Sequence, residues 1–361
     1  MIFLKICGQF IKVMQQKIIS IHELRKYNPN LNESDFADLM FAAFLHQKEN
    51  WGMLSEGWKG FHSSKYRHYK FDWCGSNESG SKDHFEIKTQ YNPTRFISSS
   101  AKVDRETIKN RKCFLCINNL PKEQKGIIFE AQLIVLCNPA PIFNEHFTIS
   151  HIEHKPQLIL NNIDLMMRLT KAVDGDYSIF YNGPKCGASA PDHFHFQACP
   201  ANELIAENDV LNHEENFKTI YSSEEYSIAA SENYLRNVII VKSKSIDSIV
   251  KLFQSIYKIL QEITETSDEP MMNLLSFFED EVFYLIIFPR EKHRPEVYFT
   301  EGEERMLVSP GLVDMAGMLV TPLQKDFERM NVELIEKIYG EVTLKQDKFN
   351  KIIDLLQTKN L

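Results

Sequence analysis

Two histidines and a glutamine alternate with phenylalanines in residues 193–197, which read His-Phe-His-Phe-Gln. A period of two is typical of a β-strand, so we expect His193, His195 and Gln197 to share one face and the phenylalanines to point into a core. The preceding turn, residues 183–189, is rich in small residues whose backbone N–H groups can approach an anion closely. A phosphate-binding turn followed by an imidazole on a rigid strand predicts nucleophilic attack on phosphorus.

This pattern resembles the histidine-triad superfamily, whose active strand reads His-x-His-x-His in the hydrolases and His-x-His-x-Gln in the transferases. The glutamine form is similar to the branch of galactose-1-phosphate uridylyltransferase, diadenosine tetraphosphate phosphorylase and GDP-L-galactose phosphorylase. In that branch the second histidine is the nucleophile, which implies this role for His195, with His193 and Gln197 beside it. The relatives have Ser-x-x-His before the motif, whereas here Asp192 adds one residue between Ser189 and His193.

A Cys-x-x-Cys pair, Cys113 and Cys116, precedes the strand and can bind a zinc ion through two thiolates. Three histidines follow within residues 146–154, and two histidines would complete a tetrahedral site. The segments are similar to those of histidine-triad proteins, and the resemblance implies Cys113, Cys116, His154 and His193 as ligands of a structural zinc ion. The alternative is a reduced thiol pair in the core, with the histidines on the surface.

The glutamine bears on the type of reaction, because an amide can donate a hydrogen bond to a phosphoryl oxygen but cannot deliver a proton. That suits a leaving group that is already a stable anion, such as phosphate or a sugar phosphate. We therefore expect a nucleotidyltransferase or nucleotide-sugar phosphorylase that acts through a nucleotidyl-His195 intermediate. Its substrate would be a nucleoside diphosphate sugar or a dinucleotide, and its acceptor phosphate or a sugar phosphate.

Two alternatives stay open. The first is a dinucleoside polyphosphate or nucleotide hydrolase of the same fold, against which Gln197 argues, since a third histidine would favour hydrolysis. The second is a nucleotide-binding protein without catalysis, which the additional Asp192 suggests.

The phosphate charge must be neutralised by other side chains, because the sequence contains no Walker-type loop. Our candidate substrate-binding residues lie in the small-residue turn, after a Tyr-Asn-Pro element, at the start of an Asn-x-x-Pro element and after Pro289: Lys185, Gly187 and Ser189; Arg95; Asn138; and Arg290, Lys292, His293 and Arg294. The first element resembles the Tyr-Asn-Pro segment that precedes the metal motif of uridylyltransferases. The second resembles the Asn-x-x-Pro segment that lines the nucleotide pocket of the relatives, which implies a ribose contact for Asn138. The alternatives are a solvated surface position for each basic residue and turn capping for Asn138.

The composition is that of a globular protein, with 43% hydrophobic and 25% charged residues in 361, a length sufficient for two domains. A net charge of −8 argues against a nonspecific nucleic-acid binder, and no apolar run has the length of a transmembrane helix. Seven cysteines, an odd number, do not fit a disulfide framework, so we expect a reducing, cytoplasmic setting. The expected partners are the substrate and acceptor, with no nucleic acid or membrane, and a homodimer is compatible with the sequence.

The periodicity predicts an α+β fold. Strands are expected at 133–137, 147–149, 177–181 and 193–199, with a helix at about 157–173 between the second and third. A second set follows, with strands at 237–242, 273–278 and 282–288 and an amphipathic helix at 246–260, but without a second His-x-His-x-Gln. The resemblance implies two histidine-triad-like domains, each an antiparallel sheet with packed helices: a partly helical extension at 1–88, a catalytic domain at 89–205, and a second domain without the catalytic strand at 206–361.

Overall fold

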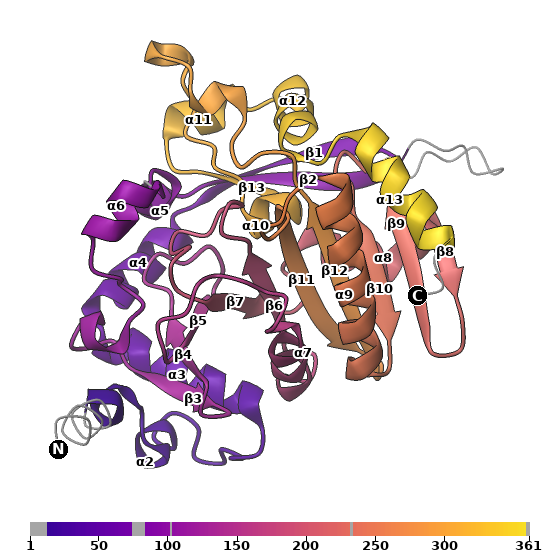
Figure 1. Cartoon of the computed structure of the whole chain (residues 1–361). Coiled ribbons are helices and arrows are strands. Elements are labelled where there is room, and N and C mark those ends of the chain that lie inside the picture. The colour runs from indigo at the N-terminus through magenta and orange to yellow at the C-terminus, as the bar shows by residue number, and fades with distance from the viewer. Residues whose placement is uncertain (1–12, 74–83, 102, 232–233, 359–361) are drawn as a thin grey trace.

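The structure of the chain, a computed structural model, describes residues 13–73, 84–101, 103–231 and 234–358. Within these residues it contains one sheet of ten strands and one of three, with helices packed against them (Figure 1). All neighbouring strands of the larger sheet are antiparallel. The α+β fold predicted from the sequence is confirmed.

The ten-stranded sheet consists of two halves with the same topology. The strands of the first half are β3 (Gly126–Phe129), β4 (Leu133–Cys137), β5 (Phe147–His151), β6 (Tyr177–Asn182) and β7 (His195–Pro200). Those of the second half are β8 (Phe217–Ser222), β9 (Tyr226–Ser231), β10 (Ile239–Ser243), β11 (Met272–Glu279) and β12 (Val282–Pro289). The order across the sheet is β3-β4-β5-β7-β6-β11-β12-β10-β9-β8. When the strands of each half are numbered along the chain, both halves run 1-2-3-5-4 from the outer edge to the middle of the sheet.

The halves meet where β6 pairs with β11, with Asn182 opposite Asn273. One helix connects the third and fourth strands in each half: α7 (Ile163–Ala172) in the first and α9 (Ile246–Ile263) in the second. The Ser245 side chain caps α9 by accepting from the backbone N–H of Ser248. Both helices lie on the same face of the sheet (Figure 1) and bury apolar side chains in one core, together with α3 (Phe36–Asn50) and α13 (Gln346–Thr358).

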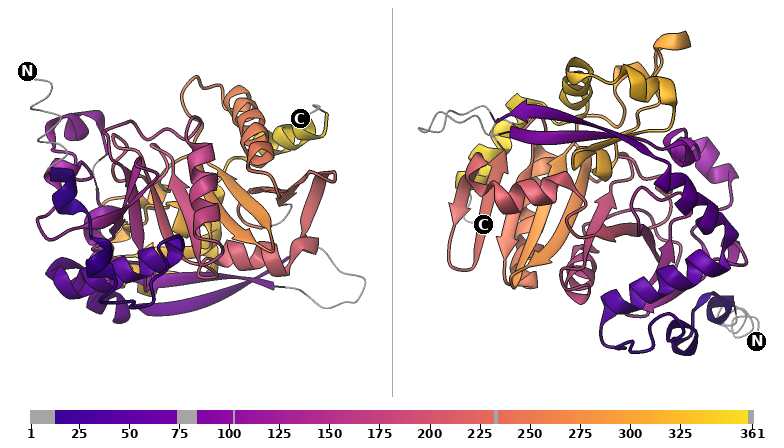
Figure 2. Two further views of the ribbon diagram at one scale, coloured as in Figure 1. Left: turned by 90° about the horizontal axis from the view of Figure 1, so that it is seen from below. Right: turned by 180° about the vertical axis from the view of Figure 1, so that it is seen from behind.

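The opposite face of the large sheet packs against the three-stranded sheet. This sheet contains β1 (Lys65–Asp72), β2 (His84–Tyr91) and β13 (Met318–Thr321), with β1 antiparallel and β13 parallel to β2. Figure 2 shows β1 and β2 as a long ribbon that extends across both halves of the large sheet. The remaining helices are α2 (Ile21–Leu24), α4 (Gly52–His62), α5 (Phe96–Ser99), α6 (Arg105–Asn110), α8 (Ile205–Asn212), α10 (Leu312–Met315), α11 (Gln324–Arg329) and α12 (Val332–Val342).

The alternating residues of β7 separate onto these two faces as predicted. Phe194, Phe196 and Ala198 belong to the core beneath α7 and α9, whereas Cys199 belongs to the core under the three-stranded sheet. His195 and Gln197 share the face of Cys199, because side chains two residues apart point the same way. The three-stranded sheet therefore lies on the side of the candidate active residues.

Among the element boundaries that differ from the prediction, those at the start of β7 and of α7 have identifiable reasons. β7 begins at His195 and not at His193, because the backbone N–H of His193 donates to Ala190 in a turn. α7 begins at Ile163 and not near residue 157, because backbone N–H groups there have tertiary partners: that of Gln157 donates to Pro191 and that of Ile159 to Glu269.

The expected extension at residues 1–88 ends inside β2, which pairs with β13 from the far end of the chain. Within the described ranges, no helix has the length and apolar character needed to cross a membrane. The five cysteines described are all free: Cys113, Cys116, Cys137, Cys186 and Cys199.

Candidate functional site

His195 is held by its backbone and by one ring nitrogen. The side-chain amide of Gln157 bonds to both backbone groups of His195: Oε1 accepts from its N–H at 2.7 Å and Nε2 donates to its carbonyl at 2.9 Å. The ring Nδ1 lies 2.8 Å from the carbonyl oxygen of His193. Because a carbonyl only accepts, Nδ1 carries the proton and Nε2 keeps its lone pair.

The ring of His195 is 3% exposed, and burial lowers its pKa to about 4. The neutral ring with a fixed tautomer therefore presents an unprotonated Nε2. This is the form of imidazole that can attack an electrophilic phosphorus.

Gln197 lies two residues further along β7, and its amide is oriented by His146. The Nδ1 atom of His146 accepts from the backbone N–H of Ile142 at 3.2 Å, which leaves the ring proton on Nε2. That Nε2 donates to Oε1 of Gln197 at 2.8 Å. The carbonyl side of the amide thus has its partner, and the NH₂ side remains available as a donor. Burial and the neighbouring charge of Arg95 lower the pKa of His146 to about 3, so it stays neutral.

The four predicted metal ligands come together. The ligand atoms of Cys113, Cys116, His154 and His193 all lie within 4.8 Å of one another. Cys113 Sγ is 3.3 Å from Nδ1 of His193, and Cys116 Sγ is 3.2 Å from Nδ1 of His154. Two thiolates and two imidazoles form a donor set typical of structural zinc.

The cluster of candidate metal ligands is connected to His195 through His193. Its Nε2 donates to the carbonyl of His151 at 2.7 Å, so Nδ1 is free to bind a metal. Its own carbonyl accepts the proton of His195 Nδ1. Whatever fixes His193 in the cluster therefore also fixes the acceptor that sets the tautomer of His195.

The turn before β7 is pinned at Gly187, which has a φ of +95°. A Cβ atom at Gly187 would lie 2.6 Å from the Cα of Gly311, so only glycine fits this contact. Ser189 is half-buried, and its side chain makes no hydrogen bond within the described residues. The additional Asp192 forms an ion pair with Arg111, which ties the turn to the segment just before Cys113.

A buried polar network supports the same turn from the second half of the sheet. Asn273 Nδ2 donates to the carbonyl of Cys186 at 2.7 Å and to Oδ1 of Asn182 at 2.8 Å. Arg290 in turn donates to Oδ1 of Asn273 at 2.5 Å. The other donors of Arg290 bond to the carbonyls of Pro310, Val342, Lys292 and His293. All five N–H groups of Arg290 thus have partners, which gives it a framework role in place of the expected phosphate contact.

The two proline elements lie against each other close to His146. Asn92 Nδ2 donates to the carbonyl of Pro141 at 2.9 Å, and Arg95 donates to that of Ala140 at 2.8 Å. Asn138 makes the capping contact, since its Oδ1 accepts from the backbone N–H of Ala140 at 3.0 Å. Asn138 Nδ2 also donates to Thr148, which lies opposite Gln197 on the neighbouring strand.

The other basic candidates have partners of their own. Lys185 is exposed and pairs with Asp268 at 2.9 Å, and Lys292 pairs with Glu341 at 3.0 Å. His293 and Arg294 both bond to the hydroxyl of Ser309, at 3.1 Å and 2.9 Å. Ser309 precedes Gly311, so these two side chains support the segment on which Gly187 rests.

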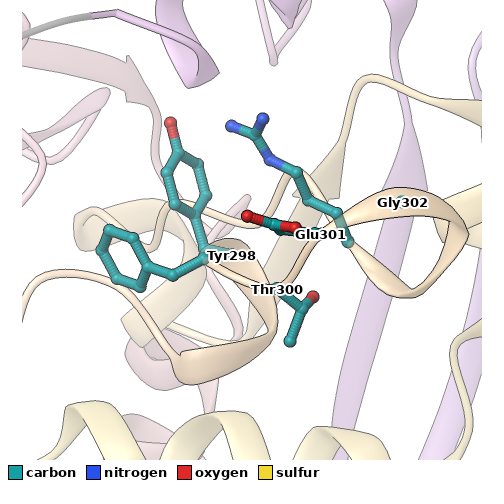
Figure 3. A pocket seen from close by; sticks show the side chains of 6 residues that line it. Tyr298, Thr300, Glu301 and Gly302 are labelled. Carbon is teal, nitrogen blue, oxygen red and sulfur yellow. The ribbon is translucent and has the colours of Figure 1, made fainter.

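A shallow pocket of about 380 Å³ lies elsewhere, around Tyr298 (Figure 3). Its lining residues are Tyr298, Phe299, Thr300, Glu301, Gly302 and Arg305. None of the predicted site residues lines it.

Sequence reasoning missed two amides, and it left the role of His146 open. Gln157 clamps the nucleophile, Asn273 holds the turn and His146 orients Gln197. The two amides lie far from the motif in sequence and carry no local signal. His146 was visible as one of three neighbouring histidines, but only the fold separates it from the metal ligands.

Comparison with known proteins gives matches along most of the chain. Residues 43–200 match a family described as a domain of unknown function (DUF4922), and residues 211–359 match the GDPGP1-like C-terminal domain. No curated protein matches the sequence. The crystal structure of yeast Ap4A phosphorylase Apa2 in complex with AMP is similar, with a TM-score of 0.55 and 14% identity over 87% of this chain and 98% of that chain. The same protein with Ap4A gives a TM-score of 0.54 and 16% identity over 87% and 99%.

At these identities, the likeness to the yeast structures shows the fold. That fold carries the His-x-His-x-Gln strand here, and the C-terminal part matches the GDPGP1-like domain. The fold and the motif thus agree with the resemblance to the glutamine-type branch of the histidine-triad superfamily that the sequence indicates.

Proposed function

We propose that the protein is a nucleotidyltransferase or phosphorylase that works through a covalent nucleotidyl-His195 intermediate. The observation that carries the proposal is the state of His195: neutral, with Nδ1–H donating to His193 and Nε2 unprotonated. In the first step, Nε2 attacks the α-phosphorus of a nucleotide. An N–P bond forms and the P–O bond to the leaving group breaks. The leaving group departs with the electron pair as an anion, which is a sugar phosphate from a nucleoside diphosphate sugar or a nucleotide from a dinucleotide.

In the second step an oxygen of the acceptor attacks the same phosphorus. A new P–O bond forms, the N–P bond breaks, and Nε2 recovers its lone pair. With inorganic phosphate as acceptor, the product is a nucleoside diphosphate. The proton on Nδ1 stays in place throughout, so neither step requires a general acid.

Gln197 serves this chemistry as a donor. Because His146 occupies Oε1, the NH₂ group of Gln197 is free to bind a nonbridging phosphoryl oxygen. Such a donor stabilises the negative charge on the phosphoryl group in the transition state. It supplies no proton to a leaving group, which favours transfer to phosphate over hydrolysis.

The substrate class follows from the expected leaving group together with the relatives. The yeast protein is named Ap4A phosphorylase and was crystallised with AMP and with Ap4A. We propose a substrate with a phosphoanhydride bond at the α-phosphorus, either a nucleoside diphosphate sugar or a dinucleotide. Candidate contacts are Gly187, Ser189 and Lys185 in the turn, and Arg95 and Asn138 at the proline elements.

A zinc ion fits the Cys113, Cys116, His154 and His193 cluster, because the donor set is complete and the second ring nitrogen of His193 is already bound. Four protein ligands leave no open position, so the ion would cross-link the chain and take no part in the reaction. We also propose a reducing, cytoplasmic setting, because it keeps the thiols reduced and able to bind the ion. Association as a homodimer stays a prediction.

The experiment is a product assay with GDP-, UDP- and ADP-sugars and with Ap4A, each with and without inorganic phosphate. We expect one class to be consumed only with phosphate, with release of a nucleoside diphosphate. Rapid consumption in water that phosphate does not divert would favour the hydrolase. Binding detected by thermal shift without turnover or adduct would favour the non-catalytic nucleotide-binding protein.

A further inference from the structure

Ser150 is the cross-strand neighbour of the nucleophile. It lies on β5 directly opposite His195 on β7, and opposing residues of an antiparallel pair project from the same face. The Ser150 side chain is fully buried. Its hydroxyl has no hydrogen-bond partner among the described residues.

The neighbour of Ser150 on β4 is apolar and offers its hydroxyl no hydrogen-bond partner. On the other side of β5, Ser150 faces Ile134 of β4, which belongs to a small apolar cluster with Leu120 and Leu136. The next row along the sheet differs, because the hydroxyl of Thr148 accepts a hydrogen bond from Asn138. Ser150 is thus a buried hydroxyl in an apolar row that ends at His195.

In the second half of the sheet an apolar pair lies on the corresponding strands and on the same face. There β10 takes the place of β5 and β12 that of β7, and Ile240 lies opposite Ile286 on the face beneath the three-stranded sheet. Aliphatic side chains can therefore pack on this face of the strand pair. A buried hydroxyl without a partner costs free energy that an aliphatic side chain would not.

We propose that Ser150 is a further catalytic residue, whose hydroxyl donates a hydrogen bond to a nonbridging oxygen of the phosphoryl group on His195. This rests on the proposed covalent intermediate. Directly opposed side chains have Cβ atoms about 4.5–5.5 Å apart, which brings a group bonded to the ring of His195 within reach of the hydroxyl. Ser150 and Gln197 would then donate from β5 and β7 to the same phosphoryl group, and the charge that grows on its oxygens would gain both donors.

The test is Ser150→Ala, assayed with Ap4A and with a GDP-sugar in the presence of inorganic phosphate. We expect kcat and the rate of adduct formation to fall at least tenfold, with KM changed little. The melting temperature should stay the same or rise, because the lost hydroxyl had no partner. A merely structural serine would lower the melting temperature.

Ser178→Ala is the matched control. Ser178 lies on the same face, on β6 opposite Cys199, and is equally buried, but its hydroxyl donates to Glu207 at 2.7 Å. We expect this variant to lose thermal stability and to keep a rate near that of the wild type.

Two results would overturn the inference on Ser150. They are an unchanged rate in Ser150→Ala, or a lower rate that comes with a lower melting temperature. In either case an adduct on the wild-type protein would leave the proposed function standing. Absence of any adduct on the wild type would refute the proposed function itself.

Discussion

β7 in the first half of the sheet and β12 in the second occupy the same place in two units of the same topology, yet their inner faces differ. β7 presents His195 and Gln197 beneath the three-stranded sheet, whereas β12 presents Ile286 and Phe288 there. The fold alone therefore does not make a reactive site. The polar side chains to which we assign the chemistry lie in one half only.

The connections that precede β12 and β7 also differ, in length and in content. β11 and β12 are joined by Asp280 and Glu281, both with positive φ, as a tight type I′ hairpin turn requires. β6 and β7 are joined by residues 183–194, which contain the candidate phosphate turn. A two-residue hairpin turn is stabilised by the strands it joins. The long connection at residues 183–194 is instead held in place by contacts with other segments: the Cys/His cluster, Gln157 and Asn273.

Among the predicted changes, loss of the Cys/His cluster should have the largest effect on stability and turnover, because the cluster holds the segment before β7 that carries His193. We expect zinc in near-stoichiometric amount by elemental analysis of protein purified without chelator. Cys116→Ser should destabilise the protein by several kcal/mol, on the order of what structural zinc contributes, and abolish turnover.

Cys137→Ala is the control for this substitution, since Cys137 is buried in the core of the same half but lies outside the cluster. It should keep both metal and activity. Protein without metal, and a Cys116→Ser variant that melts like the wild type, would contradict the account.

Asn273→Ala tests whether the second half supports the turn of the first. It removes the partner of the Cys186 carbonyl and leaves one N–H of Arg290 buried without Oδ1, at a cost of about 1–3 kcal/mol for each group. We expect kcat/KM to fall about 10- to 100-fold, measured with the nucleotide that the wild type consumes.

Asn237→Ala provides the comparison for Asn273. Asn237 is also a buried amide of the second half, but it donates to Leu344, away from the turn. It should reduce stability by a similar amount with turnover preserved. Equal losses of activity in both variants would show that the effect is general destabilisation.

His146→Phe should have a smaller effect, because it removes the orienting partner of Gln197 and not the donor itself. A freely rotating amide presents its carbonyl to the phosphoryl group part of the time, so we expect kcat to fall about tenfold. The hydrogen bond from Ile142 is lost as well, at about 1 kcal/mol. Unchanged kcat would mean that Gln197 needs no orientation by His146.

The smallest expected effect is a change in pH dependence at Glu269, which joins the two halves. Its carboxylate accepts from the hydroxyl of Tyr181 and from the backbone N–H of Ile159, and burial raises its pKa to about 7. Between pH 4.5 and 7 this carboxyl binds more protons in the folded than in the unfolded state, so its own contribution to stability falls as the pH rises.

Glu269→Gln should remove this pH-dependent contribution, about 1–3 kcal/mol across the range, so the variant should lose less stability than the wild type, or gain more, when the pH rises from 5 to 8. The melting temperatures of the two proteins at pH 5 and pH 8 measure this difference. Part of the slope should remain, because burial also raises the pKa of Glu207 to about 7. An unchanged slope would show that Glu269 is ionised throughout this pH range.

The sequence predicts what depends on local pattern or on a motif. β4 spans the predicted residues, and β11 and β12 lie within one residue of the predicted ranges, because each is a short, largely apolar run typical of a buried strand. The four metal ligands come together as the resemblance implied.

Other features depend on groups that the chain brings together only when folded. The charge of Arg290 suggested a phosphate contact, yet its five N–H groups bond to four backbone carbonyls and to Asn273. The parallel pairing of β13 with β2 joins residues far apart in sequence, which no local periodicity reveals. For the same reason the clamp of Gln157 on His195 could not be read from the motif.

The most direct test of the central claim is the intact mass of the protein mixed with Ap4A or a GDP-sugar in the absence of acceptor. We predict that the wild-type chain gains one nucleotidyl group, which added phosphate removes, and that His195→Ala gains none while remaining folded and metal-bound. An adduct on His195→Ala, or a tenth or more of wild-type turnover in that variant, would contradict the covalent mechanism.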